Sequence, residues 1–247
     1  MGMLSVLDWL GGNWTLAMEE ILKAFEMQER LGFTFRADRY EAWRGLFHLG
    51  LGELEEAEKY LQTALAMQDH QITLKVETYL GLGLLRLEQS REDEASSHFE
   101  TCVNAFKDAE FATMPLLHVE TLLHLTSLHA KGGRFEEARK MSEWAKRLAQ
   151  TLKSDAGLAM ASQAEAAVLL AGGDRKGADE AYLKSLGLWE KAGWPYYRAK
   201  ALVAYSEALA QEDREESRKR LEQAAEIFRK LGAKRDIERI EAKLTAS

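Results

Sequence analysis

The sequence has a single cysteine, two prolines and no long apolar run in its 247 residues. One cysteine, Cys102, excludes an intrachain disulfide framework and suits a reducing compartment, for which we take the cytoplasm. No stretch reaches the roughly 18 uncharged apolar residues of a membrane-spanning helix. The opening segment MGMLSVLDWLGG is too short and lacks the basic start of a signal peptide. We therefore expect no membrane insertion and no secretion.

The sequence also has no concentrated basic segment. Its net charge is -7, and acidic and basic residues alternate along it. Such alternation is typical of solvated helix faces with ion pairs at i and i+4. A phosphate backbone calls for a clustered basic surface instead, so we expect no nucleic-acid partner. Abundant helix-forming residues and few prolines favour helix and exclude a disordered chain.

A small residue recurs at spacings of 38 to 43 residues along the chain. These anchor positions are Ala17, Ala57, Ala95, Ala138, Ala178 and Ser217. A period near 40 made of two helical segments predicts a solenoid, because one helix pair cannot bury its own apolar face. Stacking of successive pairs supplies the missing core.

Other positions fall into register with the anchors. Five residues before each anchor a turn is predicted, at Gly12, Gly52, Ser90, Gly133, Gly173 and Glu212. Small residues recur twelve positions before the anchor, at Ser5, Gly45, Gly83, Thr126, Ala166 and Tyr205 with one bulky exception. Bulky residues recur four positions after it, at Ile21, Leu61, Phe99, Tyr182 and Leu221, with Ser142 in the fourth repeat. This register predicts closely packed antiparallel pairs.

Helix pairs are predicted over 4–31, 36–70, 72–107, 114–151, 156–192 and 195–231, with a last helix from Arg235. The absence of a Gly/Ser/Pro-rich linker predicts one continuous domain over residues 1–247. The first pair, 1–31, has a short first helix, which suggests a C-terminal fragment of a larger protein. Residues 235–247 are predicted to form a capping helix and tail, with Ile237, Ile240 and Leu244 on one stripe.

This pattern of small, bulky and glycine positions resembles the tetratricopeptide repeat over nearly the whole chain. That repeat usually has a period of about 34 residues and a closing Asp-Pro, which is absent here. The longer period, with Leu-Gly ending several second helices, is similar to arrays in bacterial signalling ATPases and maltose-activator-type transcriptional regulators. The resemblance implies an all-α, right-handed superhelical solenoid of antiparallel helix pairs, with about six pairs plus the capping helix.

In the family that the chain resembles, the first helix of each pair lines a concave groove. The candidate groove residues are therefore on the first helices, at Arg39, Trp43, Leu46, Glu77, Leu80, Leu84, Glu120, Leu123, His124, Ser127, Gln163, Leu202 and Ser206. An equally weighted alternative is that the apolar members merely pack first helix against first helix.

The sequence offers little for chemistry. His118, His124 and His129 stand six and five residues apart, so neighbouring members do not share a helix face. His98 and Cys102 have i,i+4 spacing, but Cys102 occupies a small packing position. No nucleophile, base or metal set satisfies the geometry, so we predict no cofactor, no metal and no enzymatic activity.

Three functions remain open from the sequence. The leading one is a non-catalytic scaffold that binds a protein or peptide, as the interaction or sensor region of a larger regulatory protein. The alternative is a ligand-sensing array that controls an upstream ATPase, cyclase, kinase or DNA-binding domain. A homodimer is also possible through the edge of the incomplete first repeat, formed by Leu7, Trp9, Leu10 and Trp14.

Overall fold

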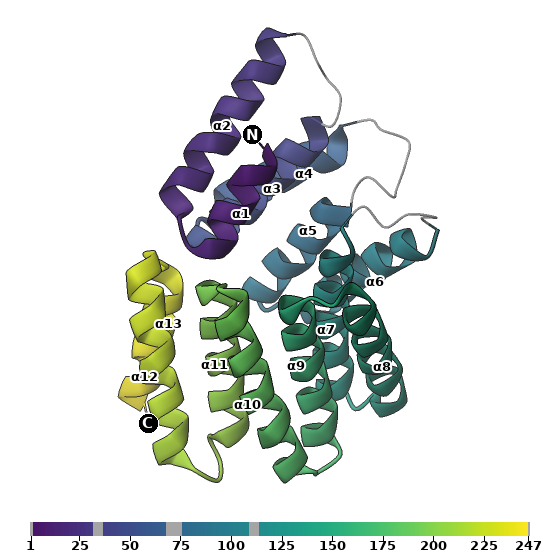
Figure 1. Ribbon diagram of the computed structural model, residues 1–247, viewed down its shortest axis with the longest axis vertical. Helices are drawn as coiled ribbons and strands as arrows, with labels where there is room; N and C mark the ends of the chain where they lie inside the picture. Colours follow the sequence, from purple (N-terminus) through teal and green to yellow (C-terminus); the bar gives the residue numbers. More distant parts are fainter. Residues whose placement is uncertain (1, 32–36, 68–75, 109–113, 247) are drawn as a thin grey trace. The chain divides into compact units, whose positions relative to one another are not determined.

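The computed structural model describes residues 2–31, 37–67, 76–108 and 114–246. Within these ranges the regular structure consists of thirteen α-helices without a strand, which confirms the predicted all-α class (Figure 1). The chain forms two compact units, Met1–Ala112 and Thr113–Ser247. Their union into one continuous domain stays a prediction. None of the described helices is both long enough and apolar enough to cross a membrane.

The first unit holds three helix pairs. They are α1 (Gly2–Gly11) with α2 (Trp14–Arg30), α3 (Ala37–Leu51) with α4 (Leu54–Ala66), and α5 (Val76–Glu88) with α6 (Glu92–Asp108). Successive pairs touch because α3 packs on both α2 and α5. As predicted, α1 is short, with 10 residues against 15 in α3.

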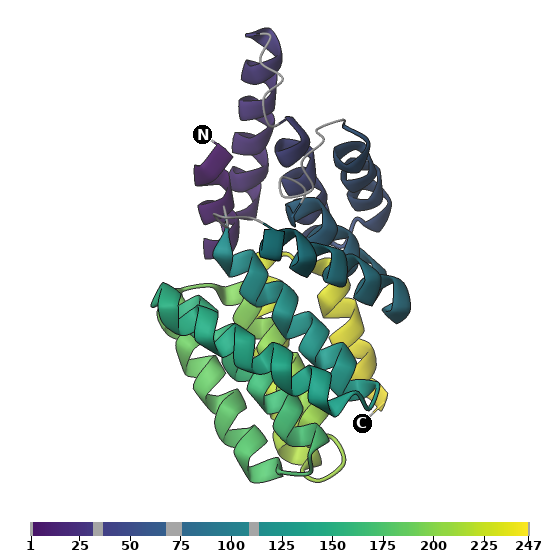
Figure 2. The same ribbon diagram turned by 90° about the vertical axis from the view of Figure 1, so that its right-hand side faces the viewer.

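The second unit holds three further pairs and a last helix (Figure 2). The pairs are α7 (Pro115–Lys131) with α8 (Phe135–Leu152), α9 (Asp155–Ala171) with α10 (Arg175–Ala192), and α11 (Pro195–Leu209) with α12 (Arg214–Leu231), followed by α13 (Lys234–Ala246). Both prolines stand at the first turn of a helix, where a missing N–H leaves no hydrogen bond unmade. They mark the starts of α7 and α11.

The repeat register forms the core of both units. All six anchor residues are buried, and so are the bulky residues four positions later in the five repeats that have one. The small positions are explained by close approach: a Cβ on Gly83 would lie 2.3 Å from a ring atom of Phe99. A Cβ on Gly45 would likewise lie 2.6 Å from Leu61 Cγ. In each of these two pairs, the bulky side chain of the second helix therefore fits only because the residue facing it on the first helix is glycine.

The turns within pairs follow the prediction in five repeats. Gly12, Gly52, Gly133 and Gly173 have positive φ angles of 73° to 94°, and Ser90 has 59°. The prediction of the same turn at Glu212 is wrong. There Ala210 closes α11 in the right-handed region, and the N–H groups of Glu212 and Asp213 both donate to Leu209 O.

The predicted helix-end glycines have two outcomes. Gly193 and Gly232 close α10 and α12 in the left-handed conformation, as expected for helix caps. Gly32 lies outside the described residues.

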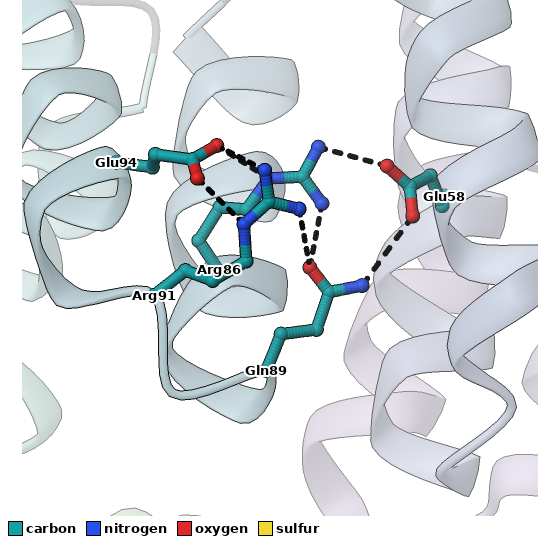
Figure 3. Close-up of polar contacts among 5 residues, drawn as sticks. All are labelled: Glu58, Arg86, Gln89, Arg91 and Glu94. Carbon is teal, nitrogen blue, oxygen red and sulfur yellow. Dashed lines mark hydrogen bonds and ion pairs between the residues drawn. The ribbon is translucent and has the colours of Figure 1, made fainter.

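A polar network joins the second and third pairs of the first unit (Figure 3). Arg86 of α5 donates to Glu58 of α4 over 2.8 Å and to Gln89 over 2.7 Å, and Gln89 donates in turn to Glu58. The hydrogen bond from Arg86 holds the pKa of Glu58 below its usual value, against the opposing effect of partial burial. Arg91 and Glu94 extend this junction into α6. The network thus ties one repeat to the next.

The last helix packs against α12 as the sequence predicts. Ile240 is buried, while Ile237 and Leu244 are partly buried. Arg229 of α12 and Glu241 of α13 form an ion pair at 3.1 Å. The described part of α13 therefore covers the apolar side of the final pair.

Candidate binding face on the first helices

In the first unit, two of the predicted contact residues bind each other. Arg39 Nε of α3 lies 2.8 Å from Glu77 Oε1 of α5, as an ion pair. The Glu77 side chain is 3% exposed and the Arg39 side chain 24%. The two residues hold equivalent positions in successive repeats. Their ion pair therefore links α3 to α5.

The apolar candidates of the first unit divide by exposure. Trp43 and Leu80 are buried, and the Trp43 ring lies 6.1 Å from that of Phe47. Leu46 and Leu84 remain partly exposed. Trp43 and Leu80 thus belong to the core, whereas a groove role for Leu46 and Leu84 stays a prediction.

In the second unit, four candidates lie at or near the surface of two adjacent first helices. Leu123 and His124 on α7 and Gln163 on α9 are partly exposed, and Ser127 on α7 is exposed. The Ser127 hydroxyl donates to Leu123 O one turn earlier over 3.0 Å. Helices α7 and α9 pack against each other. The adjacent helices α7 and α9 thus together present one apolar and three polar side chains at or near the surface.

Glu120 lies one turn before this face but is only 5% exposed. The Tyr197 hydroxyl of α11 donates to its Oε2 over 3.5 Å. Burial raises the pKa of Glu120 to about 7, and the bond from Tyr197 opposes the rise only in part. Burial, together with the neighbouring carboxyl, raises the pKa of Tyr197 well above 10. The hydrogen bond between Tyr197 and Glu120 joins α11 to α7, the first helices of two pairs that have another pair, α9 and α10, between them in the chain.

An aromatic cluster at the start of α11 holds Tyr197 in place. Trp189 of α10 stacks on Tyr197 with ring centroids 5.2 Å apart, and Trp194 lies 5.9 Å from Trp189. Sequence reasoning missed this cluster as a functional neighbour. The signal that it passed over is the run Trp194-Pro195-Tyr196-Tyr197, in which four consecutive residues have rings.

The remaining candidates on α11 serve packing. Leu202 and Ser206 are each 2% exposed. The hydroxyls of Ser206 and Ser217 lie 3.3 Å apart, and Ser217 also donates to Ser206 O over 2.8 Å. These contacts join α11 to α12, so we remove both residues from the candidate face.

His118, His129 and Cys102 serve packing. His118 is buried with its ring edge-on to Trp144 at 4.6 Å, and His129 is also buried. Cys102 is fully buried and its thiol donates to Val76 O over 3.6 Å. Among the described residues no group of three His, Cys, Asp or Glu side chains could hold a metal ion.

The predicted self-association edge is wrong in its main residues. Trp9 and Trp14 are only 6% and 5% exposed, because Trp9 stacks between Trp14 at 4.3 Å and Phe47 at 4.5 Å. Leu10 is partly buried. Leu7 alone of the four is well exposed. Trp9 of α1 thus packs on Phe47 of α3, and Trp14 of α2 stacks on Trp9, within the same unit.

Comparison with known proteins agrees with this fold. Residues 36–108 match the tetratricopeptide repeat family, whose members generally act as scaffolds for protein–protein interaction. The chain is also similar in fold to the crystal structure of PilW, described as a widely conserved type IV pilus biogenesis factor. That match has 16% identity and a TM-score of 0.52, and it covers 99% of this chain and 90% of PilW. The sequence matched none of the curated proteins compared with it.

Proposed function

We propose that the chain is a non-catalytic scaffold that binds a protein or peptide segment across α7 and α9. The observation that supports this most directly is the partial exposure of Leu123, His124 and Gln163, together with exposed Ser127, on two adjacent first helices. A packing role alone would bury these side chains, as it buries Leu202 and Ser206.

The chemistry of the face defines the segment that it fits. Leu123 offers an apolar contact for one anchoring side chain, while His124, Ser127 and Gln163 offer hydrogen-bonding groups to either side of it. A segment with an apolar anchor flanked by polar groups uses both features. Most of the binding energy is expected at the apolar anchor, because exposed polar contacts replace bonds to water.

The test compares substitutions on the face with matched substitutions elsewhere. Leu123→Arg and Ser127→Arg should each remove partners that the parent chain captures from its own cells, as measured by quantitative mass spectrometry. Leu183→Arg and Thr151→Arg place the same arginine at exposed leucine and hydroxyl positions of second helices and should leave capture unchanged. Equal loss in both sets, at matched thermal stability, would refute this face.

The wider setting is proposed on the sequence alone. The period near 40 residues suggests a signalling array that regulates a partner domain, and the single cysteine suggests the cytoplasm. The absence of a suitable nucleophile, base or metal pattern in the sequence supports a role without catalysis. The test is the effect of Leu123→Arg on the output of any partner that the chain captures: an unchanged output on loss of binding contradicts regulation.

A further inference from the structure

The first helix pair exposes an unusual amount of apolar surface. Of the eight large apolar side chains that are exposed among the described residues, six lie on α1, on α2 or directly after α2, namely Leu4, Leu7, Leu16, Leu22, Met27 and Leu31. Leu16, Met27 and Leu31 lie on one side of α2 by helical spacing, with exposures of 45%, 49% and 63%. We call these three residues the α2 stripe.

The α2 stripe faces away from the core of its own pair. The buried residues of α2 are Trp14, Ala17, Ile21 and Ala24, which lie on another side of the helix. A hollow of about 370 Å³ lies against the second half of α2, lined in part by Met27 and Leu31. Half-buried Glu20 and exposed Lys23 lie between Leu16 and Met27 on the same side and interrupt the apolar residues of the stripe.

We infer that the α2 stripe binds the α2 stripe of a second copy of this chain, with the two helices antiparallel. In that arrangement Leu16 of one copy lies opposite Leu31 of the other, and Met27 packs near the two-fold axis. A symmetric dimer presents the same surface twice, so the surface must complement itself. The inference is independent of the proposed binding face on α7 and α9.

The charges beside the stripe meet this requirement. Glu19, Lys23, Glu26 and Arg30 follow one another along the flank of α2, all exposed, with contacts within the helix of 3.6 Å for Lys23 to Glu19 and 4.0 Å for Arg30 to Glu26. Two antiparallel copies of a helix bring the same flank face to face. Glu19 then lies opposite Arg30, and Lys23 lies opposite Glu26.

Both charge pairs share one centre. The midpoint of positions 19 and 30 and that of positions 23 and 26 coincide between residues 24 and 25. The midpoint of Leu16 and Leu31 lies within one residue of the same place. The antiparallel register that pairs all four charges therefore also brings Leu16 to within two positions of Leu31. A parallel arrangement would instead bring this flank beside the opposite flank of the partner helix, so these four charges would not meet one another.

The first test is sedimentation velocity of the whole chain over a dilution series. The parent should change from monomer to dimer as concentration rises, and Met27→Glu should weaken the dimer roughly a hundredfold by placing two carboxylates in an apolar contact. Leu22→Glu makes a similar change at an exposed leucine of α2 outside the stripe and should leave the dimer intact. A parent that stays monomeric at every concentration overturns the inference.

A charge exchange tests the register separately. Lys23→Glu or Glu26→Lys alone should weaken the dimer about tenfold, because each sets two like charges opposite each other. Mixing the two variants should restore a dimer, since the two carboxylates of one variant then face the two ammonium groups of the other. Mixed variants that associate no better than either alone would contradict the antiparallel register. Since all these side chains are exposed, the substitutions test the dimer without disturbing the fold.

Discussion

Arg39 and Glu77 hold the same position in two successive repeats, and they form an ion pair at 2.8 Å between α3 and α5. A sequence alignment of repeats treats both as outward polar groups available to a partner. In the structure the two form an ion pair, and Glu77 is almost wholly buried. Polar residues at repeat positions can thus serve the array itself.

Removal of Arg39 should destabilise the first unit more than removal of both partners. Arg39→Leu leaves Glu77 buried without this cation and should lower the free energy of unfolding by about 3 kcal/mol. The double variant Arg39→Leu/Glu77→Leu should lose less unfolding free energy than Arg39→Leu alone. A double-mutant cycle by urea unfolding measures the coupling, and strict additivity would contradict the buried pair.

The ion pair between Arg139 and Glu136 provides a matched control. Its atoms lie 2.9 Å apart, but both side chains are mostly exposed. Arg139→Leu should therefore leave the free energy of unfolding nearly unchanged. A loss equal to that of Arg39→Leu would show that burial does not decide the effect.

Glu120 should make stability fall as pH rises. Its pKa is raised from 4.5 to about 7 in the folded chain, so the folded state holds the proton more tightly. The stabilisation is fully present below pH 4.5 and is lost as pH rises to about 7, by about 3 kcal/mol in all. Unfolding free energies of the parent and of Glu120→Gln across this window measure it.

Glu120→Gln should remove this pH dependence while it keeps a hydrogen-bond acceptor for Tyr197. Above pH 7 the variant should be more stable than the parent, because the amide carries no charge into the buried site. Identical slopes for parent and variant between pH 4.5 and 7 would contradict the raised pKa.

The glycines at packing positions should not tolerate a methyl group. Gly83→Ala forces a Cβ into the ring of Phe99 and should destabilise the chain by about 1 to 3 kcal/mol. Gly187 is also inside a helix, but a Cβ there meets nothing within 4 Å. Gly187→Ala should stabilise by about 0.5 to 1 kcal/mol through helix propensity. Thermal unfolding of the two variants checks the opposite signs.

Trp9 should act as a core residue of the first unit. Trp9→Ala removes a ring that stacks on both Trp14 and Phe47, and should lower stability by about 3 to 5 kcal/mol. Denaturant unfolding measures the loss. If Trp9 instead belonged to an exposed dimer edge, the variant would remain as stable as the parent and would change only the state of association.

The sequence was sufficient to predict the helix pairs, the core and most turns. Ala57, Gly83 and Phe99 occupy predicted packing positions, because spacing along a helix determines which residues share its inner face. Ser90 even takes the positive φ predicted at a position where most repeats have glycine. The turn between α11 and α12 is the exception. It uses a right-handed conformation at Ala210 in place of a residue with positive φ, and the repeat pattern does not predict which of the two conformations forms.

The candidate face was harder to predict because its residues depend on contacts between distant segments. Glu120 is buried beside Tyr197, 77 positions along the chain. Periodicity identifies the stripe on which a residue lies, but not whether the next helix covers it. For the same reason the sequence places Trp9 and Trp14 at an open edge, whereas in the structure Trp9 stacks on Phe47 of α3 and Trp14 stacks on Trp9.

The most direct test of the proposed binding face is photo-crosslinking from single positions of the intact chain in its own cells. A photoreactive amino acid at Ser127 should form covalent adducts with a partner. The same amino acid at Thr151, exposed on second helix α8, should form none. Adducts from Ser127 alone are the result that the binding face predicts. Equal adducts from both positions, or adducts from Thr151 only, would contradict it.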